Sequence, residues 1–216
     1  MTHIVLLGDS IFDNAPYVQT GEAVIHHLKR RIPNTWKATL LAIDGAVTRE
    51  VHEQLQQLPP DATHLFLSVG GNDALGHIDY LRQPAESVAE VMLGFAKFSQ
   101  DFSAAYSAVI AALLSHQLPT TVCTIYNPSF EQADQNTIAS MALTFWNNVI
   151  TQAAITNGLS ITELRQIFTS PEDYANPIEP SSMGGAKLAE TIATIVQNND
   201  FIDSEPRTIV LGGRAV

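Results

Sequence analysis

The fold is decided near the amino terminus by the stretch His3-Ile4-Val5-Leu6-Leu7-Gly8-Asp9-Ser10. A short run of β-branched residues and leucine that stops at a glycine is typical of a buried strand ending in a turn. Runs of the same length and composition follow it, each ended by Gly, Asn or Pro, at 38–43, 64–69, 121–126 and 159–162. The chain is therefore expected to contain five buried strands.

Helical patterns separate these strands. The clearest spans Asp134 to Asn157, with apolar residues at helical spacing and Gly158 as its stop. A longer pattern runs from Pro84 to Leu114, and Ser181 or Ser182 can cap a last helix. Strands that alternate with helices predict the α/β class, with a mainly parallel five-stranded sheet covered by helices on both faces.

The domain organisation follows from the same patterns. Residues 1–198 contain no repeat, low-complexity tract or linker and are expected to form a single domain. Residues 199–216 hold Ser204-Glu205-Pro206 and Gly212-Gly213. This tail is expected to be either frayed or an appended edge strand.

Composition excludes several classes of partner. The 216 residues carry 11 Lys and Arg against 22 Asp and Glu, a net charge of -11. Nucleic acid is a poor partner for such a chain, because its binding depends on cations that neutralise phosphates. The single cysteine, Cys123, is expected to be a buried core residue without a disulfide. No apolar run approaches the about 20 residues needed to span a bilayer, and no signal peptide is visible, so we expect a cytoplasmic protein. The sequence does not indicate an oligomeric state.

The turns after three of the predicted strands carry an unusual set of groups. The first strand leads into Gly8-Asp9-Ser10, the second into Asp44-Gly45-Ala46 and the third into Gly70-Gly71-Asn72-Asp73. In parallel sheets, ligands bind at the carboxyl ends of the strands, where these turns would meet. A serine hydroxyl, a glycine amide and a carboxamide at one edge could supply a nucleophile and stabilise an oxyanion, as acyl transfer requires.

In this order, these motifs resemble those of the SGNH hydrolases, the GDSL-type esterase and lipase family. The resemblance implies a flavodoxin-like three-layer α/β/α sandwich with Ser10 as the nucleophile. It also implies that the amides of Ser10 and Gly45, together with the Asn72 side chain, form the oxyanion hole. The Gly-x-Ser-x-Gly motif of the α/β-hydrolases does not occur.

The fourth motif departs from that family. The family carries an Asp-x-x-His pair before the last helix, whereas this chain reads Asn176-Pro177-Ile178-Glu179. Aligned with the family, Glu179 stands at the position of the histidine base and Asn176 at that of its aspartate partner. An unperturbed Glu has a pKa about two units below that of His and is a weaker base, but burial raises a carboxyl pKa. We therefore expect Glu179 to be the base.

His77 is a second residue of interest, because it follows Asn72 closely at the same sheet edge. We expect it to bind substrate, and it is the alternative base. A zinc motif is not completed at His52-Glu53, since Gln56 stands where the second histidine would be needed. No metal or cofactor is expected, and the glycine motifs of nucleotide-binding folds are missing.

Two functions remain open from the sequence. The first is a carboxylester hydrolase that forms an acyl-Ser10 intermediate on a small-molecule ester. The second is a binding or scaffold protein that keeps the fold after its catalytic groups have decayed. Such decay would explain why the histidine is missing.

Overall fold

The computed structural model describes residues 1–198 and 210–211, and within them the main sheet is parallel throughout with the order β2-β1-β3-β4-β5-β8. A separate antiparallel hairpin pairs β6 with β7. The strands are β1 (His3–Gly8), β2 (Lys37–Leu40), β3 (His64–Ser68), β4 (Thr120–Cys123), β5 (Ser160–Thr162), β6 (Tyr174–Asn176), β7 (Glu179–Pro180) and β8 (Val210–Leu211).

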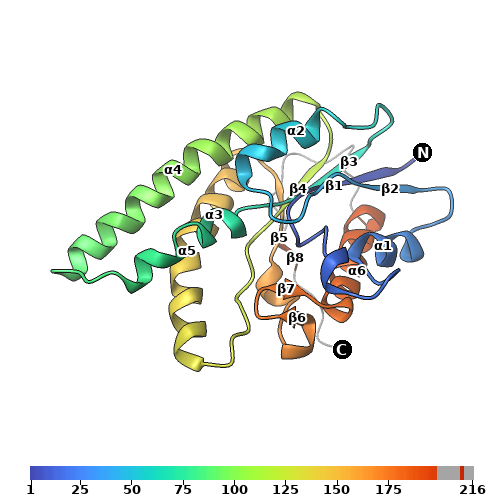
Figure 1. Cartoon of the computed structure of the whole chain (residues 1–216). Coiled ribbons are helices and arrows are strands. Elements are labelled where there is room, and N and C mark those ends of the chain that lie inside the picture. The colour runs from blue at the N-terminus through green and yellow to red at the C-terminus, as the bar shows by residue number, and fades with distance from the viewer. Residues whose placement is uncertain (199–209, 212–216) are drawn as a thin grey trace.

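Helices cover both faces of the main sheet (Figure 1). They are α1 (Val24–Arg31), α2 (Val51–Leu55), α3 (Gly71–Leu75), α4 (Val88–Ser115), α5 (Ala133–Thr156) and α6 (Ser182–Asn198). Short 3-10 turns lie between them: η1 (Ala15–Tyr17), η2 (Thr48–Glu50), η3 (Ile78–Arg82), η4 (Leu164–Gln166) and η5 (Pro171–Asp173).

The alternation of side chains along β1 explains the three layers. Ile4 and Leu6 pack in one core with α1 and α6, whereas Val5 and Leu7 pack in a second core with α2, α4 and α5. Successive strand residues point to opposite faces, so a strand buried on both sides must be apolar at every position. All of β1 is buried, and the first strand of the sequence therefore lies at the centre of the molecule.

The predicted fold class is confirmed. The five expected strands form a parallel sheet in the order 2-1-3-4-5, and β8 adds a sixth strand beside β5. Apart from Val210–Leu211, the predicted tail 199–216 lies outside the described residues, and the domain boundary at 198 stays a prediction.

Two strands end earlier than their apolar runs. Leu41, Ala42 and Ile43 leave β2 but still donate backbone hydrogen bonds to β1, at 2.8, 3.0 and 3.0 Å. After β4, the side chain of Asn147 bonds both the N–H and the C=O of Ile125, at 2.7 and 2.8 Å, and so replaces a neighbouring strand. The loops that lead into the site therefore begin sooner than the sequence pattern suggests.

The helix ends are set by serine caps. The predicted helix from Pro84 begins only at Val88, because Ser87 accepts the N–H of Glu90 at 3.1 Å. For the last helix, Ser181 is the capping residue, since its hydroxyl accepts the N–H of Gly184 at 3.2 Å.

In the part of the chain that the structure describes, no helix combines the length and the apolar character needed to cross a bilayer.

Candidate active site

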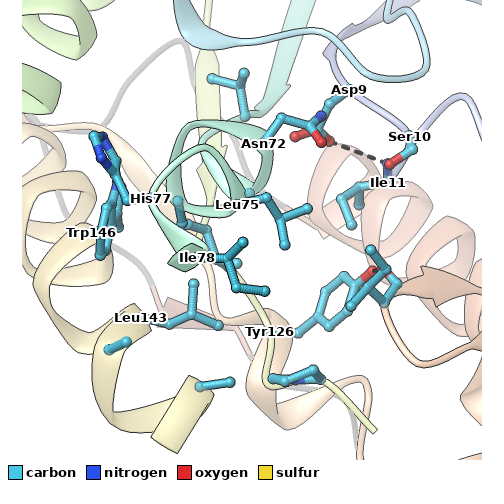
Figure 2. Close-up of a pocket in the computed structure, with 18 of the residues that line it drawn as sticks. Asp9, Ser10, Ile11, Asn72, Leu75, His77, Ile78, Tyr126, Leu143 and Trp146 are labelled. Atoms are coloured by element: carbon cyan, nitrogen blue, oxygen red, sulfur yellow. Dashed lines mark hydrogen bonds between the residues drawn. The ribbon is translucent and has the colours of Figure 1, made fainter. Parts of the chain in front are cut away.

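A pocket opens at the carboxyl ends of β1 and β3 and extends between α3, α4 and α5 (Figure 2). Ser10, Asn72 and Glu179 line it at one end, together with Asp9. The rest of its wall is mostly apolar and includes Leu75, Ile78, Leu81, Phe95, Ile125, Tyr126, Phe130, Ala142, Leu143 and Trp146. The structure thus gathers three side chains from distant parts of the sequence around one apolar cavity.

Ser10 is held by a rigid turn after β1. The buried side chain of Gln54 bonds both the N–H and the C=O of Gly8, each at 2.7 Å. The following N–H, of Asp9, donates to the carbonyl of Ser68 at 3.0 Å. The N–H of Ser10 has no acceptor among the described residues, so it is available to a ligand.

Carboxylates and an amide tie the three strand-end loops together. Asp13, in the first loop, accepts the N–H of Asp44 in the second at 3.0 Å. Asn72, on α3, donates its side-chain N–H to the carbonyl of Ala46 at 3.0 Å. Asp73 accepts both the N–H and the hydroxyl of Thr48, each at 2.9 Å. One N–H of the Asn72 amide is thereby used to orient the group, and the second remains for the pocket.

Gly45 occupies a different position from the other predicted site residues. It is exposed, with φ of +79°, and it is not part of the pocket wall. Its loop is nevertheless fixed beside Asn72 through Ala46, and its N–H has no acceptor in residues 1–198 or 210–211. The positive φ favours glycine, because other L-residues rarely adopt it.

Glu179 is carried by the β6–β7 hairpin rather than by the main sheet. The hairpin is anchored through main-chain carbonyls on either side of the carboxylate. The hydroxyl of Tyr126 donates to the carbonyl of Ile178, and the N–H of Ser129 donates to that of Pro177 at 2.8 Å. The fully buried amide of Asn14, in the loop after Ser10, donates to the carbonyl of Pro180 at 3.2 Å. Asn14 thus links the serine loop directly to the hairpin.

Burial controls the electrostatics of Glu179. The residue is 8% exposed, and its Oε2 has no hydrogen-bond partner among the described residues. Burial raises the pKa of Glu179 to about 6, the hydroxyl of Ser10 interacts with the carboxylate and opposes this rise, and the charge of Asp44 adds to it. The Ser10 hydroxyl and the Glu179 carboxylate are therefore close enough to interact, and the carboxylate is a stronger base than an exposed glutamate.

Asp9 has an even more perturbed pKa. It is 3% exposed, and burial raises its pKa to about 8, opposed by the N–H of Ile11 and reinforced by the charges of Glu179 and Asp73. Figure 2 shows Asp9 beside Asn72 at the Ser10 end of the pocket. At neutral pH this side chain is mostly uncharged, so the excess charge at this end of the pocket rests on Glu179.

Asn176 contributes to the hairpin turn. Its side-chain oxygen accepts the N–H of Ile178 at 3.0 Å, and the residue is exposed. It forms the turn that leads into Glu179 and has no hydrogen bond to the carboxylate.

His77 lies toward the far end of the pocket from Ser10, next to Trp146 (Figure 2). Its ring stacks on Phe98 with a centroid distance of 3.9 Å, and its centroid is 6.0 Å from that of Trp146. This arrangement is compatible with the predicted contact to substrate and makes His77 a poor candidate for the base.

Sequence reasoning missed Gln54 and the neutral state of Asp9, and it left open whether Asn14, just after the nucleophile turn, shapes the cleft or caps a loop. Asn14 and Gln54 form hydrogen bonds to residues 166 and 46 positions away in the sequence, so no local pattern predicts these contacts. Within the described residues, no three His, Cys, Asp or Glu side chains are grouped closely enough to hold a metal ion.

Comparison with protein families gives one match, which covers most of the chain. Residues 6–184 match the model of the GDSL-like lipase/acylhydrolase family. Ser10, Gly45, Asn72 and Glu179 lie within the matched range. No curated protein matches the chain significantly.

Comparison with solved structures shows the same fold in several enzymes. A lipolytic G-D-S-L family protein from Veillonella parvula has a TM-score of 0.69 at 14% identity, over 92% of this chain and 100% of its own. The acetyl xylan esterase AlAXEase gives 0.67 at 18% identity, over 90% and 99% of the two chains. The extracellular lipase of Streptomyces rimosus gives 0.64 at 17% identity, over 91% and 99%.

Proposed function

Because the chain belongs to the GDSL-like lipase/acylhydrolase (SGNH) family, and is thus a hydrolase of ester bonds, we propose that it cleaves carboxylic esters through an acyl-Ser10 intermediate with Glu179 as the base. The observation that carries this proposal is the interaction between the Ser10 hydroxyl and the Glu179 carboxylate at the end of the pocket. In this proposal the carboxylate takes the role that a histidine has in the family.

Acylation begins with attack of the Ser10 oxygen on the ester carbonyl carbon, while Glu179 accepts the hydroxyl proton. The carbonyl oxygen becomes an oxyanion, which accepts hydrogen bonds from the N–H groups of Ser10 and Gly45 and from the Asn72 amide. The free N–H groups of Ser10 and Gly45 support this role. When the C–O bond to the alcohol breaks, Glu179 returns its proton to the leaving oxygen.

Deacylation repeats these steps with water. Glu179 takes a proton from the water while the water oxygen attacks the acyl carbon, and the oxyanion forms in the same position. The bond to the Ser10 oxygen then breaks and the proton passes to that oxygen, which restores the hydroxyl and releases the carboxylic acid. A base with a pKa of about 6 suits both directions, because that value is near the operating pH.

The remainder of the pocket supports an acyl group as the apolar part of the substrate. Leu75, Ile78, Leu143 and Trp146 line it beyond Ser10. Burying hydrocarbon there is favourable by about 25 cal/mol for each Å² removed from water. We therefore assign the acyl chain to this end and call it the acyl arm.

A covalent probe tests the nucleophile. A fluorophosphonate is expected to transfer its phosphonyl group to Ser10. Intact-mass analysis of the wild-type protein should then detect a single adduct. The Ser10→Ala protein should remain unlabelled, and Ser68→Ala, at another serine of the pocket wall, should still be labelled. Equal labelling of the Ser10→Ala protein would exclude Ser10 as the nucleophile, and failure to label any variant would favour the scaffold alternative.

The pH profile of kcat/KM is expected to be bell-shaped. Glu179 accepts a proton only when it is ionised, so activity should fall tenfold per unit as the pH drops below about 6. Asp9 ionises above about 8 and puts a second negative charge beside the developing oxyanion, so activity should also fall there. Besides burial, the Ser10 hydroxyl and the charge of Asp44 act on the pKa of Glu179. Asp9 stays protonated over the acidic limb, so this limb reports Glu179.

The alkaline limb has its own control. Asp9→Asn removes the ionisation and is expected to abolish the fall above pH 8 while leaving the acidic limb in place. Initial rates on a short-chain ester from pH 4 to 10 measure both limbs. An acidic midpoint near 4.5, the ordinary value for Glu, would contradict the raised pKa of Glu179.

Asn72→Ala is expected to lower kcat by about 10²- to 10³-fold with a small change in KM, because it removes a donor that acts in the transition state. Thr48→Val is the matched control. It removes a 2.9 Å hydrogen bond to Asp73, the neighbour of Asn72, without removing a donor from the pocket. Steady-state kinetics of the two variants distinguish the roles, since a merely structural Asn72 would give similar losses in both.

A further inference from the structure

The charged groups around Ser10 are distributed unevenly. The acyl arm runs from Ser10 toward His77 and Trp146 (Figure 2). An ester bond held at Ser10 has its acyl group in this arm, so its alcohol must leave on the other side of the serine. This step rests on the proposed function.

Three carboxylates near Tyr17 make up what we call the acidic rim: Asp13, Asp44 and Glu179. Asp13 and Asp44 are not part of the wall of the acyl arm, yet the charge of Asp44 acts on Glu179, so we assign the alcohol to this side. Asp13 bonds the N–H of Asp44 at 3.0 Å, and the hydroxyl of Tyr17 donates to both oxygens of Asp44 at 3.0 Å. Burial raises the pKa of Tyr17 to about 12, helped by its bond to Asp44 and by the charges of all three carboxylates. All three charges therefore act on Tyr17, and the charge of Asp44 also acts on Glu179.

Among the described residues, no Lys, Arg or His forms an ion pair with Asp13, Asp44 or Glu179. Glu179 is 8% exposed and part of the pocket wall, and its buried Oε2 has no hydrogen-bond partner within the described part of the chain. A buried carboxylate oxygen left unpaired is costly, and a positively charged ligand would reduce that cost.

We propose that the enzyme selects the alcohol part of its ester by charge, preferring cationic amino-alcohol esters over neutral ones and rejecting anionic leaving groups. The cation would lie against Asp44 and the ring of Tyr17, with the ester carbonyl at Ser10. An aromatic face together with carboxylates is a common environment for quaternary ammonium groups. The opposite orientation, with the cation in the acyl arm, would remove a charge from water without a partner.

Two esters of equal shape test the proposal. Butyrylcholine and 3,3-dimethylbutyl butyrate differ only in that a positively charged nitrogen replaces a carbon. At about 0.01 M ionic strength, kcat/KM is expected to be about tenfold higher for the choline ester, because its cation and the carboxylates of the acidic rim would attract each other over a few ångströms in a partly solvated site. The advantage should shrink toward about 1 M salt, where the screening length falls to about 3 Å.

Asp44→Asn is expected to lower this ratio several-fold, because it keeps an acceptor for Tyr17 and removes the charge. The matched control is Asp61→Asn, which removes the same charge at the opposite end of the sheet, where Asp61 pairs with His3 and Lys37. The ratio of two esters is the readout, since structural damage lowers both rates together. A ratio that responds to neither salt nor Asp44→Asn would overturn the charge selection and leave the proposed hydrolase intact.

A binding measurement separates this inference from the proposed function. The Ser10→Ala protein, titrated calorimetrically with the same two esters, is expected to bind the choline ester more tightly, by about the same tenfold factor. Equal affinities would overturn the inference. Loss of Ser10-dependent turnover on both esters, by contrast, would contradict the proposed function while the titration still tests the charge preference.

Discussion

Glu179→Gln is expected to lower kcat on a simple carboxylic ester by about 10³-fold, within the range that a positioned general base contributes. Glutamine keeps the size and hydrogen-bonding oxygen of the side chain but cannot accept the Ser10 proton at any ordinary pH. Because attack, departure of the alcohol and deacylation all use this group, no step of the cycle escapes the loss. Steady-state rates with Ser10→Ala as background measure it.

The stability of the same variant is expected to change in the opposite direction. Burial raises the pKa of Glu179 to about 6, so above that pH the folded state holds a carboxylate that would be better solvated in the unfolded chain. The stability that this group contributes is present below its unfolded pKa and is lost as the pH rises through about 6. Glutamine avoids that loss, so the melting temperature at pH 8 should hold or rise while activity falls.

Glu172→Gln is the matched control, because it makes the same chemical change at an exposed position just before the hairpin. It should leave both kcat and melting temperature nearly unchanged. Full activity of the Glu179→Gln protein would contradict the assignment of Glu179 as the base and would leave that role to water.

Gly8→Ala is expected to prevent folding. The φ of Gly8 is +124°, and a Cβ there would lie 1.8 Å from the carbonyl oxygen of Ser68 and 2.6 Å from its carbon. These are backbone atoms of the adjacent strand, paired in register with Gly8 itself, so they cannot move without breaking the β1–β3 ladder. The cost should exceed about 4 kcal/mol, a large share of the stability of an ordinary domain.

Gly21→Ala separates the two causes of this effect. Gly21 also has a positive φ, +85°, but no atom of the described residues beyond its chain neighbours lies within 4 Å of the position of its Cβ. Its variant should therefore show only the backbone cost, about 1 kcal/mol, in chemical denaturation. A Gly8→Ala protein that unfolds at the same denaturant concentration as Gly21→Ala would contradict the close approach of β1 and β3.

The fold could be predicted because each strand is a short apolar run with a clear end, and because β1 is buried at every position. The meeting of Ser10 and Asn72 follows from that prediction, since the carboxyl ends of parallel strands meet at one edge. Glu179 reaches the same place from the β6–β7 hairpin, outside the parallel sheet. The chemical roles of all three stay predictions. β2 and β4 each end three residues earlier than predicted, where hydrogen bonds to β1 or to Asn147 replace a regular ladder.

The rest of the site depends on distances that no local pattern contains. The bond from Asn14 to Pro180 joins residues 166 positions apart, and the raised pKa of Asp9 results from burial by the folded chain. His77 has a sequence signal, its place after Asn72, but its stacking on Phe98 needs the packing of α4 against the end of α3.

The hairpin that carries Glu179 is attached through the carbonyls of Pro177, Ile178 and Pro180, which belong to the main chain. Exchanging the side chains at positions 176 and 179 leaves those attachments intact, and an aspartate at 176 could still accept the N–H of Ile178. These two positions therefore suit a small combinatorial library, in which the proton acceptor and its companion are varied together to move the working pH range on an unaltered framework.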